Sequence, residues 1–269
     1  MSQSIGVFDS GIGGLTVVKE LLRCLPDERI VYFGDTARVP YGGKSAEIIQ
    51  KFSDQIVHFL LSKDVKLIVI ACNTASATAL GWLKTRYSLP IIGVIDAGTK
   101  RAVRATKNNK IGVIGTRATI GSKAYVKAIH MLNPGIKVYS KSCPLLVPIV
   151  EEQGDSTLIK LVLNKYLYEI KKKDIDTLIL GCTHYPLIKN DIQEVIGDDV
   201  KLVDSASAVA NEVKSVLSRG EKAQSIQNNN KVEEPPEHSF CFSDIPRGFK
   251  QLSKKFIGYP ISYTKISLG

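Results

Sequence analysis

Two stretches decide the fold: residues 67–77, LIVIACNTASA, and residues 178–188, LILGCTHYPLI. Each begins with a short run of branched apolar residues and continues into a cysteine and a polar turn, with Cys72 in the first and Cys182 in the second. A short apolar run bounded by a turn is typical of a buried strand in a parallel sheet. The two stretches therefore predict two equivalent strands, each with one cysteine at its carboxyl end.

Other segments repeat around these strands in the same order. SIGVFDSGIGG, which begins at Ser4, is echoed by KIGVIGTRATIGS, which begins at Lys110. GVIDAGT at Gly93 is echoed by KLVDSAS at Lys201. Because three landmarks recur at nearly matched spacing, the chain is predicted to form two similar α/β lobes.

The pattern along the whole chain is that of parallel sheets covered by helices, because β-branched runs alternate with longer segments of helical apolar spacing. The expected strands are residues 4–8, 30–33, 67–71, 91–95, 110–114, 136–139, 177–180 and 200–203, and the expected helices include 15–22, 46–62, 158–173, 206–218 and 247–256. We expect an α/β fold of two pseudo-symmetric lobes, each a mainly parallel sheet flanked by helices, with the active site in the cleft between them. We expect residues 1–97 plus 208–269 to form the first lobe, residues 98–207 the second, and the polar segment 219–237 to be a flexible connection.

The composition is that of an ordinary soluble globular protein, with 269 residues of which 44% are hydrophobic. The longest apolar runs fall far short of the ~20 residues that cross a bilayer, and we expect neither a signal peptide nor a membrane partner. A cytoplasmic location is therefore predicted. The net charge is +10, but the basic residues are scattered and no nucleic-acid-binding motif accompanies them, so we expect a basic surface that attracts small anions and no nucleic-acid partner.

The five cysteines indicate reduced thiols, since their number is odd and no C-x-x-C pair occurs. A single cysteine is most often a small core hydrophobe, the interpretation that we give to Cys24, Cys143 and Cys241. Cys72 and Cys182 differ because they occupy equivalent places, from which a thiolate and a thiol could act on opposite faces of one stereocentre. A turn that leads into a helix is expected to lower the pKa of each thiol from about 8.5 towards neutrality. A disulfide redox pair stays open as an alternative.

His184 and Asp9 each allow a structural and a functional interpretation. His184 could be a structural histidine or could tune Cys182, and C-x-H without a second His/Cys cluster predicts no metal site. Asp9 could accept a hydrogen bond from an ammonium group, or Asp9-Ser10 could cap a helix. The nearby glycines depart from the dinucleotide fingerprint at Thr16, and YGGKS departs from the P-loop at Arg38, so no nucleotide is expected.

Five motifs in this order carry a resemblance to a known family: GVFDSGIGGLTV, GDTARVPYG, ACNTASA, IGVIGTRATIGS and GCTHYPL. Together they resemble the glutamate racemases, cofactor-independent enzymes that interconvert L- and D-glutamate for peptidoglycan synthesis. The likeness runs from Ile5 to about Ala208, and HSFCFSDIPRGFKQLSKKFIG looks like a diverged form of the family's C-terminal segment.

The resemblance implies that Cys72 and Cys182 are the acid/base thiols, assisted by Asp9, His184 and Glu151, although Glu152 adjoins the last of these. It implies a glutamate site without metal or other cofactor, in a homodimer. The residues that would line this site are Asp9, Ser10, Pro40, Tyr41, Gly42, Asn73, Thr74, Thr116, Thr183 and His184. Asp35 is also a family position, for which a structural role is as good an interpretation. The alternatives are an aspartate racemase with the same thiol pair and a binding or regulatory protein on a racemase scaffold.

Overall fold

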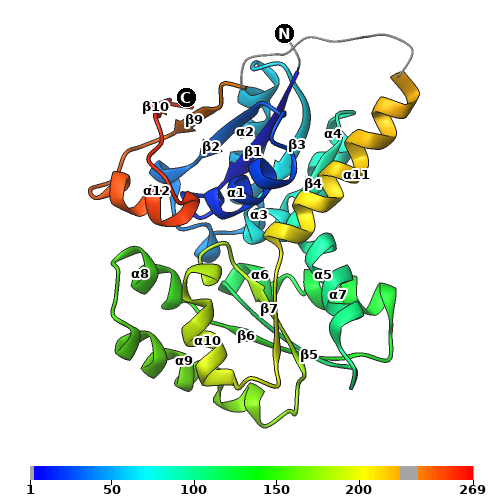
Figure 1. Ribbon diagram of the computed structural model, residues 1–269, viewed down its shortest axis with the longest axis vertical. Helices are drawn as coiled ribbons and strands as arrows, with labels where there is room; N and C mark the ends of the chain where they lie inside the picture. The colour runs from blue at the N-terminus through cyan, green and yellow to red at the C-terminus, as the bar shows by residue number, and fades with distance from the viewer. Residues whose placement is uncertain (1–2, 225–235, 269) are drawn as a thin grey trace.

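The computed structural model describes residues 3–224 and 236–268 and contains two sheets, one above the other in Figure 1. The six-stranded sheet has the order β10-β9-β2-β1-β3-β4, and the four-stranded sheet has the order β6-β5-β7-β8. Each strand pairing in the described part of the chain is parallel. The predicted α/β fold with two parallel, helix-flanked sheets is therefore confirmed.

Eight of the strands lie where the sequence predicts them, and two short C-terminal strands were not predicted. The strands are β1 (Ser4–Asp9), β2 (Ile30–Gly34), β3 (Val65–Ile70), β4 (Ile91–Gly93), β5 (Lys110–Gly115), β6 (Lys137–Ser142), β7 (Thr177–Gly181), β8 (Lys201–Asp204), β9 (Ser239–Phe242) and β10 (Thr264–Lys265). The helices are α1 (Leu15–Cys24), α2 (Ala46–Leu61), α3 (Asn73–Thr78), α4 (Leu80–Arg86), α5 (Val94–Ala105), α6 (Arg117–Gly121), α7 (Ala124–Leu132), α8 (Leu146–Glu151), α9 (Ser156–Lys171), α10 (Lys189–Ile196), α11 (Ala206–Gln224) and α12 (Phe249–Ile257), with short 3-10 helices η1 (Thr36–Arg38), η2 (Tyr41–Gly43) and η3 (Tyr185–Ile188).

The six-stranded sheet is buried on both faces, which explains the unbroken apolar runs of its central strands. Successive residues of a strand point to opposite faces. Val7 of β1 accordingly belongs to the core cluster that contains α1, α11 and α12 side chains, whereas Phe8 belongs to the cluster that contains α2 side chains. In the four-stranded sheet, Ile179 packs with α5 and α7, and its neighbours Leu178 and Leu180 pack with α9 and α10.

Two helices carry the chain between the sheets. α5 joins β4 to β5, and α11 leads from β8 towards the C-terminal segment, whose β9 pairs with β2 in the first sheet. α5 and α11 lie against each other (Figure 1). The predicted lobe boundaries fall within these two helices, so the division of the chain into lobes stays a prediction. The predicted flexible connection 219–237 is wrong for residues 219–224, which continue α11, and its residues 225–235 lie outside the described part of the chain.

The strand register corrects one landmark of the internal repeat. Ile70 pairs with Gly93, and Leu180 pairs with Asp204. Since Ile70 and Leu180 each lie two residues before a repeated cysteine, Gly93 is the equivalent of Asp204, and Asp96 is not. The predicted strand 91–95 ends at Gly93, because Asp96 already lies in the first turn of α5.

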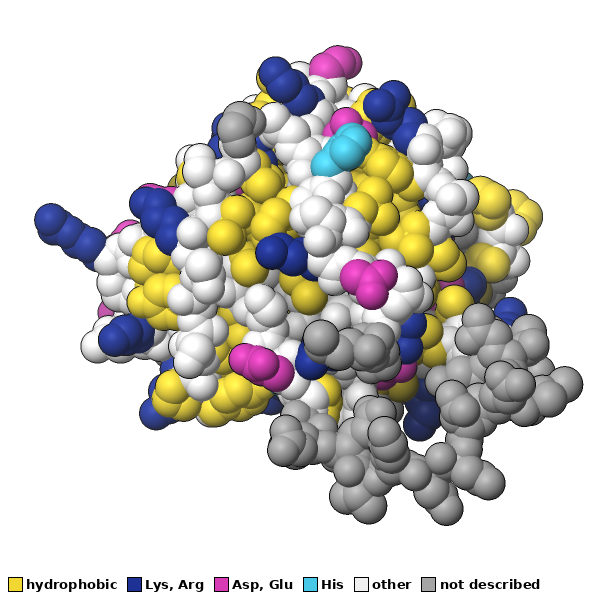
Figure 2. Space-filling model, turned by 90° about the horizontal axis from the view of Figure 1, so that it is seen from above, with side chains coloured by type: hydrophobic (Ala, Val, Ile, Leu, Met, Phe, Trp, Pro, Cys, Tyr) yellow, Lys and Arg dark blue, Asp and Glu magenta, His cyan; other side chains and the backbone are white. Residues whose placement is uncertain are grey.

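The basic residues do not form one continuous patch on the face seen from above. Figure 2 shows Lys and Arg side chains dispersed there among polar and apolar ones, in line with the scattered charge of the sequence. No helix in the described residues is long and apolar enough to span a membrane.

Candidate active site

A cavity of about 370 Å³ opens where strands of both sheets end. Ser10 and Cys72 follow β1 and β3 of the first sheet, and Thr116 and Cys182 follow β5 and β7 of the second. Cavities of this size suit small molecules. The two repeated cysteines thus line one cavity from two different sheets.

All but one of the residues expected at the site line this cavity. They are Ser10, Pro40, Tyr41, Gly42, Cys72, Asn73, Thr74, Thr116, Glu151, Cys182, Thr183 and His184. The exception, Asp9, is buried and does not belong to the cavity wall. The wall also contains residues that were not expected there: Val39, Gly43, Arg117, Cys143, Pro144, Val147, Pro148 and Glu152. Several of these could have been found from helical spacing, because Pro144, Val147, Pro148 and Glu151 recur at three- and four-residue intervals.

Cys72 is the N-cap of α3 and is held by two neighbours. Its Sγ accepts the backbone N–H of Ala75 at 3.4 Å and donates to Ser10 Oγ at 3.4 Å. Burial, reinforced by the charge of Asp9, raises the pKa of the Cys72 thiol to about 12. The predicted lowering is therefore wrong for Cys72, since the cost of burying a thiolate exceeds the stabilisation from Ser10 and from the start of α3.

Cys182 has a different set of neighbours. Its Sγ lies 3.8 Å from His184 Nδ1, and His184 Nε2 lies 2.8 Å from Glu151 Oε1. Burial disfavours the imidazolium, but the hydrogen bonds and negative charges of Cys182 and Glu151 outweigh it and raise the pKa of His184 to about 10. Glu151, and not Glu152, is thus the carboxylate that contacts the histidine. No α-helix begins directly after Cys182, since η3 intervenes before α10.

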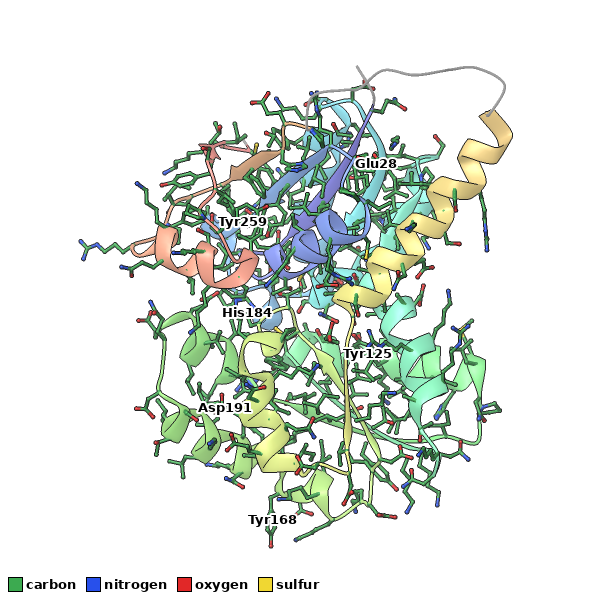
Figure 3. The ribbon with its side chains drawn as sticks, in the orientation of Figure 1. Glu28, Tyr125, Tyr168, His184, Asp191 and Tyr259 are labelled. Carbon is green, nitrogen blue, oxygen red and sulfur yellow. The ribbon has the colours of Figure 1, made fainter. Side chains whose placement is uncertain are left out.

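His184 lies between the two sheets, as Figure 3 shows, and is enclosed by residues of the first sheet's helices. The ring of Phe256 in α12 packs edge to face on the imidazole, with 5.1 Å between ring centroids. Gly13, just before α1, approaches so closely that a Cβ there would lie 2.3 Å from Thr183 Oγ1 and 2.6 Å from His184 Cε1. Thr16 Oγ1 also donates to the Thr183 carbonyl. The imidazole is therefore held by both halves of the chain.

Asp9 lies below the cavity wall, where its Oδ2 accepts the backbone N–H of Gly11 at 3.1 Å. Burial raises the pKa of Asp9, against the opposing effect of the nearby His184 charge and of backbone N–H groups. The helix-capping alternative is wrong, because the N-cap of α1 is Gly14 and no side chain caps it. Asp9 is thus a buried carboxyl group close to both His184 and Cys72.

Three threonine hydroxyls join the two sheets beside the cavity, and Thr74 and Thr116 line it. Thr74 Oγ1 lies 2.9 Å from Thr116 Oγ1 and 3.2 Å from Thr119 Oγ1. The side chain of Asn73 is fixed by Tyr125, whose hydroxyl donates to Asn73 Oδ1 at 2.6 Å. These hydroxyl and amide groups can donate hydrogen bonds to a carboxylate. Within residues 3–224 and 236–268, no three His, Cys, Asp or Glu side chains are grouped so that they could hold a metal ion.

The two-sheet fold with a cysteine from each sheet at one cavity defines a class of amino-acid racemase, and the chain belongs to the Asp/Glu/hydantoin racemase family, whose model matches residues 5–213. The chain is similar to the glutamate racemase of Geobacter metallireducens, with 48% identity over 95% of this chain and 93% of that protein. It is also similar to the glutamate racemase of Neisseria meningitidis serogroup B, with 47% identity over 98% of this chain and 97% of that protein.

Solved structures agree with this assignment. The Bacillus anthracis glutamate racemase RacE1 matches with a TM-score of 0.91 and 42% identity, covering 99% of this chain and 98% of that one. The Francisella tularensis glutamate racemase, solved in complex with D-glutamate, matches with a TM-score of 0.90 and 42% identity over the same shares. The aspartate racemase of Picrophilus torridus shares the fold, with a TM-score of 0.58 and 18% identity, covering 81% of this chain and 95% of that one.

Proposed function

We propose that this protein interconverts L- and D-glutamate by proton transfer between two thiols. The observation that carries the proposal is that Cys72 and Cys182, one from each sheet, line a single cavity of small-molecule size. Glutamate is favoured over aspartate because the similar glutamate racemases share 43–48% identity with nearly the whole chain, whereas the aspartate racemase is 18% identical.

In the proposed reaction one thiolate removes the α-proton of glutamate, so that a C–H bond breaks and an S–H bond forms. The opposite thiol then gives its proton to the other face of the carbanion, and the two cysteines exchange roles in reverse. The imidazole of His184, whose pKa is raised, lies 3.8 Å from Cys182 Sγ and would stabilise negative charge that develops on that sulfur, whereas burial raises the pKa of Cys72. The two directions of the reaction therefore begin with the thiolate on different cysteines.

The cavity would also stabilise the negative charge that develops on the substrate. Hydroxyl groups of Thr74 and Thr116 and the amide of Asn73 face the space where a carboxylate would bind. Donors that are already held in place need little reorganisation as the α-carbon loses its proton. Asp9 would assist Cys72 by exchanging a proton with it from below, since both groups are buried at the end of neighbouring strands.

We further infer that the D-glutamate produced serves peptidoglycan synthesis, that the protein acts in the cytoplasm without metal or other cofactor, and that it forms a homodimer. These proposals rest on the resemblance to glutamate racemases. We also infer the lobe division into residues 1–97 plus 208–269 and residues 98–207, because the two sheets separate near these positions. Sedimentation of the purified protein would test the dimer, and a monomer throughout would contradict it.

The deciding experiment is incubation of the purified protein with D-glutamate or D-aspartate in deuterated water, with optical rotation and α-deuterium followed together. We expect glutamate to invert and to gain deuterium at the α-carbon. Cys72→Ala and Cys182→Ala should each abolish inversion, whereas Cys24→Ala, which changes a thiol outside the cavity, should not. Inversion in either cavity variant would overturn the two-thiol mechanism, and faster inversion of aspartate would favour the alternative substrate.

A further inference from the structure

Asp35, which follows β2, is a fully buried carboxylate that does not line the cavity. Its Oδ2 accepts hydrogen bonds from Arg38 Nε at 2.7 Å and from the Tyr41 hydroxyl, and its Oδ1 accepts one from Ser243 Oγ at 2.8 Å. A buried carboxylate is costly unless such donors surround it. The three donors come from two chain segments, so the carboxylate joins them.

The first segment is the cavity loop, residues 36–43, five of which line the cavity. Within it, the ring of Tyr41 is buried and packs near Phe52, with 5.7 Å between ring centroids. Burial and the charge of Asp35 raise the pKa of Tyr41 well above its usual value, so its hydroxyl stays protonated and continues to donate. The guanidinium of Arg38, the other donor to Asp35 in this loop, stacks on the same Phe52 ring at 4.1 Å from its centroid.

The second segment is the stretch after β9, which lies beyond residues 5–213 that the family model matches. Ser243 Oγ donates to Asp35 and accepts the backbone N–H of Ala37 at 2.8 Å. One residue further, the backbone N–H of Asp244 donates to Thr36 Oγ1 at 2.9 Å. The start of the cavity loop is therefore fastened to the C-terminal segment.

The end of the cavity loop reaches the second sheet. η2 packs against α6, and a Cβ placed on Gly42 would lie 2.7 Å from Thr116 Cβ. Thr116 is one of the hydroxyl residues at the cavity. A displacement of the loop at Asp35 would therefore change both the wall that the loop forms and its fit to Thr116.

We propose that Asp35 is a positioning residue that sets the affinity of the cavity for glutamate by holding the cavity loop between the C-terminal segment and the second sheet. This inference rests on the proposed function and deepens it. Within the described residues, Asp35 makes no hydrogen bond to Cys72, Cys182 or His184, so its effect falls on substrate binding and not on proton transfer.

Asp35→Asn tests this inference, because it removes the negative charge that faces Arg38 and leaves an amide with an acceptor at only one end. We expect KM to rise about tenfold for both enantiomers and kcat to change less than about threefold, in keeping with a lost charge-assisted hydrogen bond. Calorimetric binding of D-glutamate should weaken by the same factor. If the wild type does not invert glutamate, the proposed function fails; if the wild type inverts it and folded Asp35→Asn keeps the parent KM, this inference alone is overturned.

A double-mutant cycle with Tyr41→Phe separates positioning from general destabilisation. If Asp35 acts through the Tyr41 hydroxyl, the Phe substitution raises KM in the parent and changes it less than about twofold in Asp35→Asn. Asp176→Asn is the matched control, since this carboxylate accepts backbone N–H groups of a loop far from the cavity lining, including that of Asn108 at 2.7 Å. It should lower the melting temperature without raising KM.

The inference would be overturned if the effects of Asp35→Asn and Tyr41→Phe on KM multiply in the double variant. It would also be overturned if Asp176→Asn raised KM as much as Asp35→Asn does. Should Asp35→Asn fail to fold, Tyr41→Phe and Ser243→Ala decide between the outcomes. Each removes one donor to Asp35 and is expected to raise KM several-fold. An unchanged KM in both would overturn it.

Discussion

Replacing Glu151 with Gln should move the alkaline limb of racemisation towards neutral pH. Glu151 Oε1 lies 2.8 Å from His184 Nε2, and a hydrogen bond to a charged group contributes about 1.5–3 kcal/mol. The Glu151 side chain is 34% exposed, so solvent screening limits the loss to about 1.5 kcal/mol, or about one pKa unit. The pKa of His184, about 10 in the parent, should therefore fall to about 9.

The assay is kcat/KM for both enantiomers across the alkaline range. Near pH 10, about half of the parent's His184 but only about a tenth of the variant's would be protonated, so we expect about a fivefold loss there and little loss near pH 7. Since the equilibrium constant of a racemisation is unity, kcat/KM must fall equally in both directions, and any asymmetry appears in kcat and KM. Glu152→Gln is the matched control, because the adjoining carboxylate lines the same cavity without contacting His184 in the described structure. Equal loss at both pH values, or the same shift in the control, would refute the reasoning.

Two further predictions concern close packing and pH-dependent stability. Gly13→Ala should lower kcat/KM by about a hundredfold, because the added Cβ displaces Thr183 and His184. Gly81→Ala in α4 is the control: a Cβ there meets nothing within 4 Å, so this variant should retain activity and be more stable by about 0.5–1 kcal/mol. Comparable kinetics in both variants would count against the Gly13 contact. Because folding raises the pKa of His184, the stabilisation from its protonation is complete below the unfolded value of about 6.5 and is lost as the pH rises through about 10. Urea unfolding should therefore show a smaller loss of stability over that range in His184→Asn than in the parent, and an equally steep loss would contradict the assignment.

The sequence predicts the parts of the fold that depend on apolar periodicity. All eight predicted strands are found, because each contains a run of branched apolar residues that is recognisable in the sequence. β9 escapes prediction because SFCF is short and flanked by polar residues, and its partner β2 is more than two hundred positions away. The register of the paired strands shows that Gly93 is the residue equivalent to Asp204 in the repeat, whereas sequence similarity alone favours Asp96.

The site shows the same division between local and long-range information. The residue types at Cys72 and Cys182 point to proton transfer, and the cavity brings both together. The direction of the Cys72 pKa shift could not be predicted, because it depends on burial and on Asp9, neither of which is visible in the turn itself. The choice between Glu151 and Glu152 likewise depends on which face of α8 meets His184.

The place of β9 in the first sheet has a consequence for the order in which the protein is made. β9 pairs with β2, so a growing chain presents β2 as an open edge until residues 239–242 leave the ribosome. Open edges of this kind recruit other strands and promote aggregation. A chain shortened before Ser239 should therefore be prone to aggregation even though every proposed catalytic residue is present, and chaperone demand during synthesis should ease only when β9 has docked.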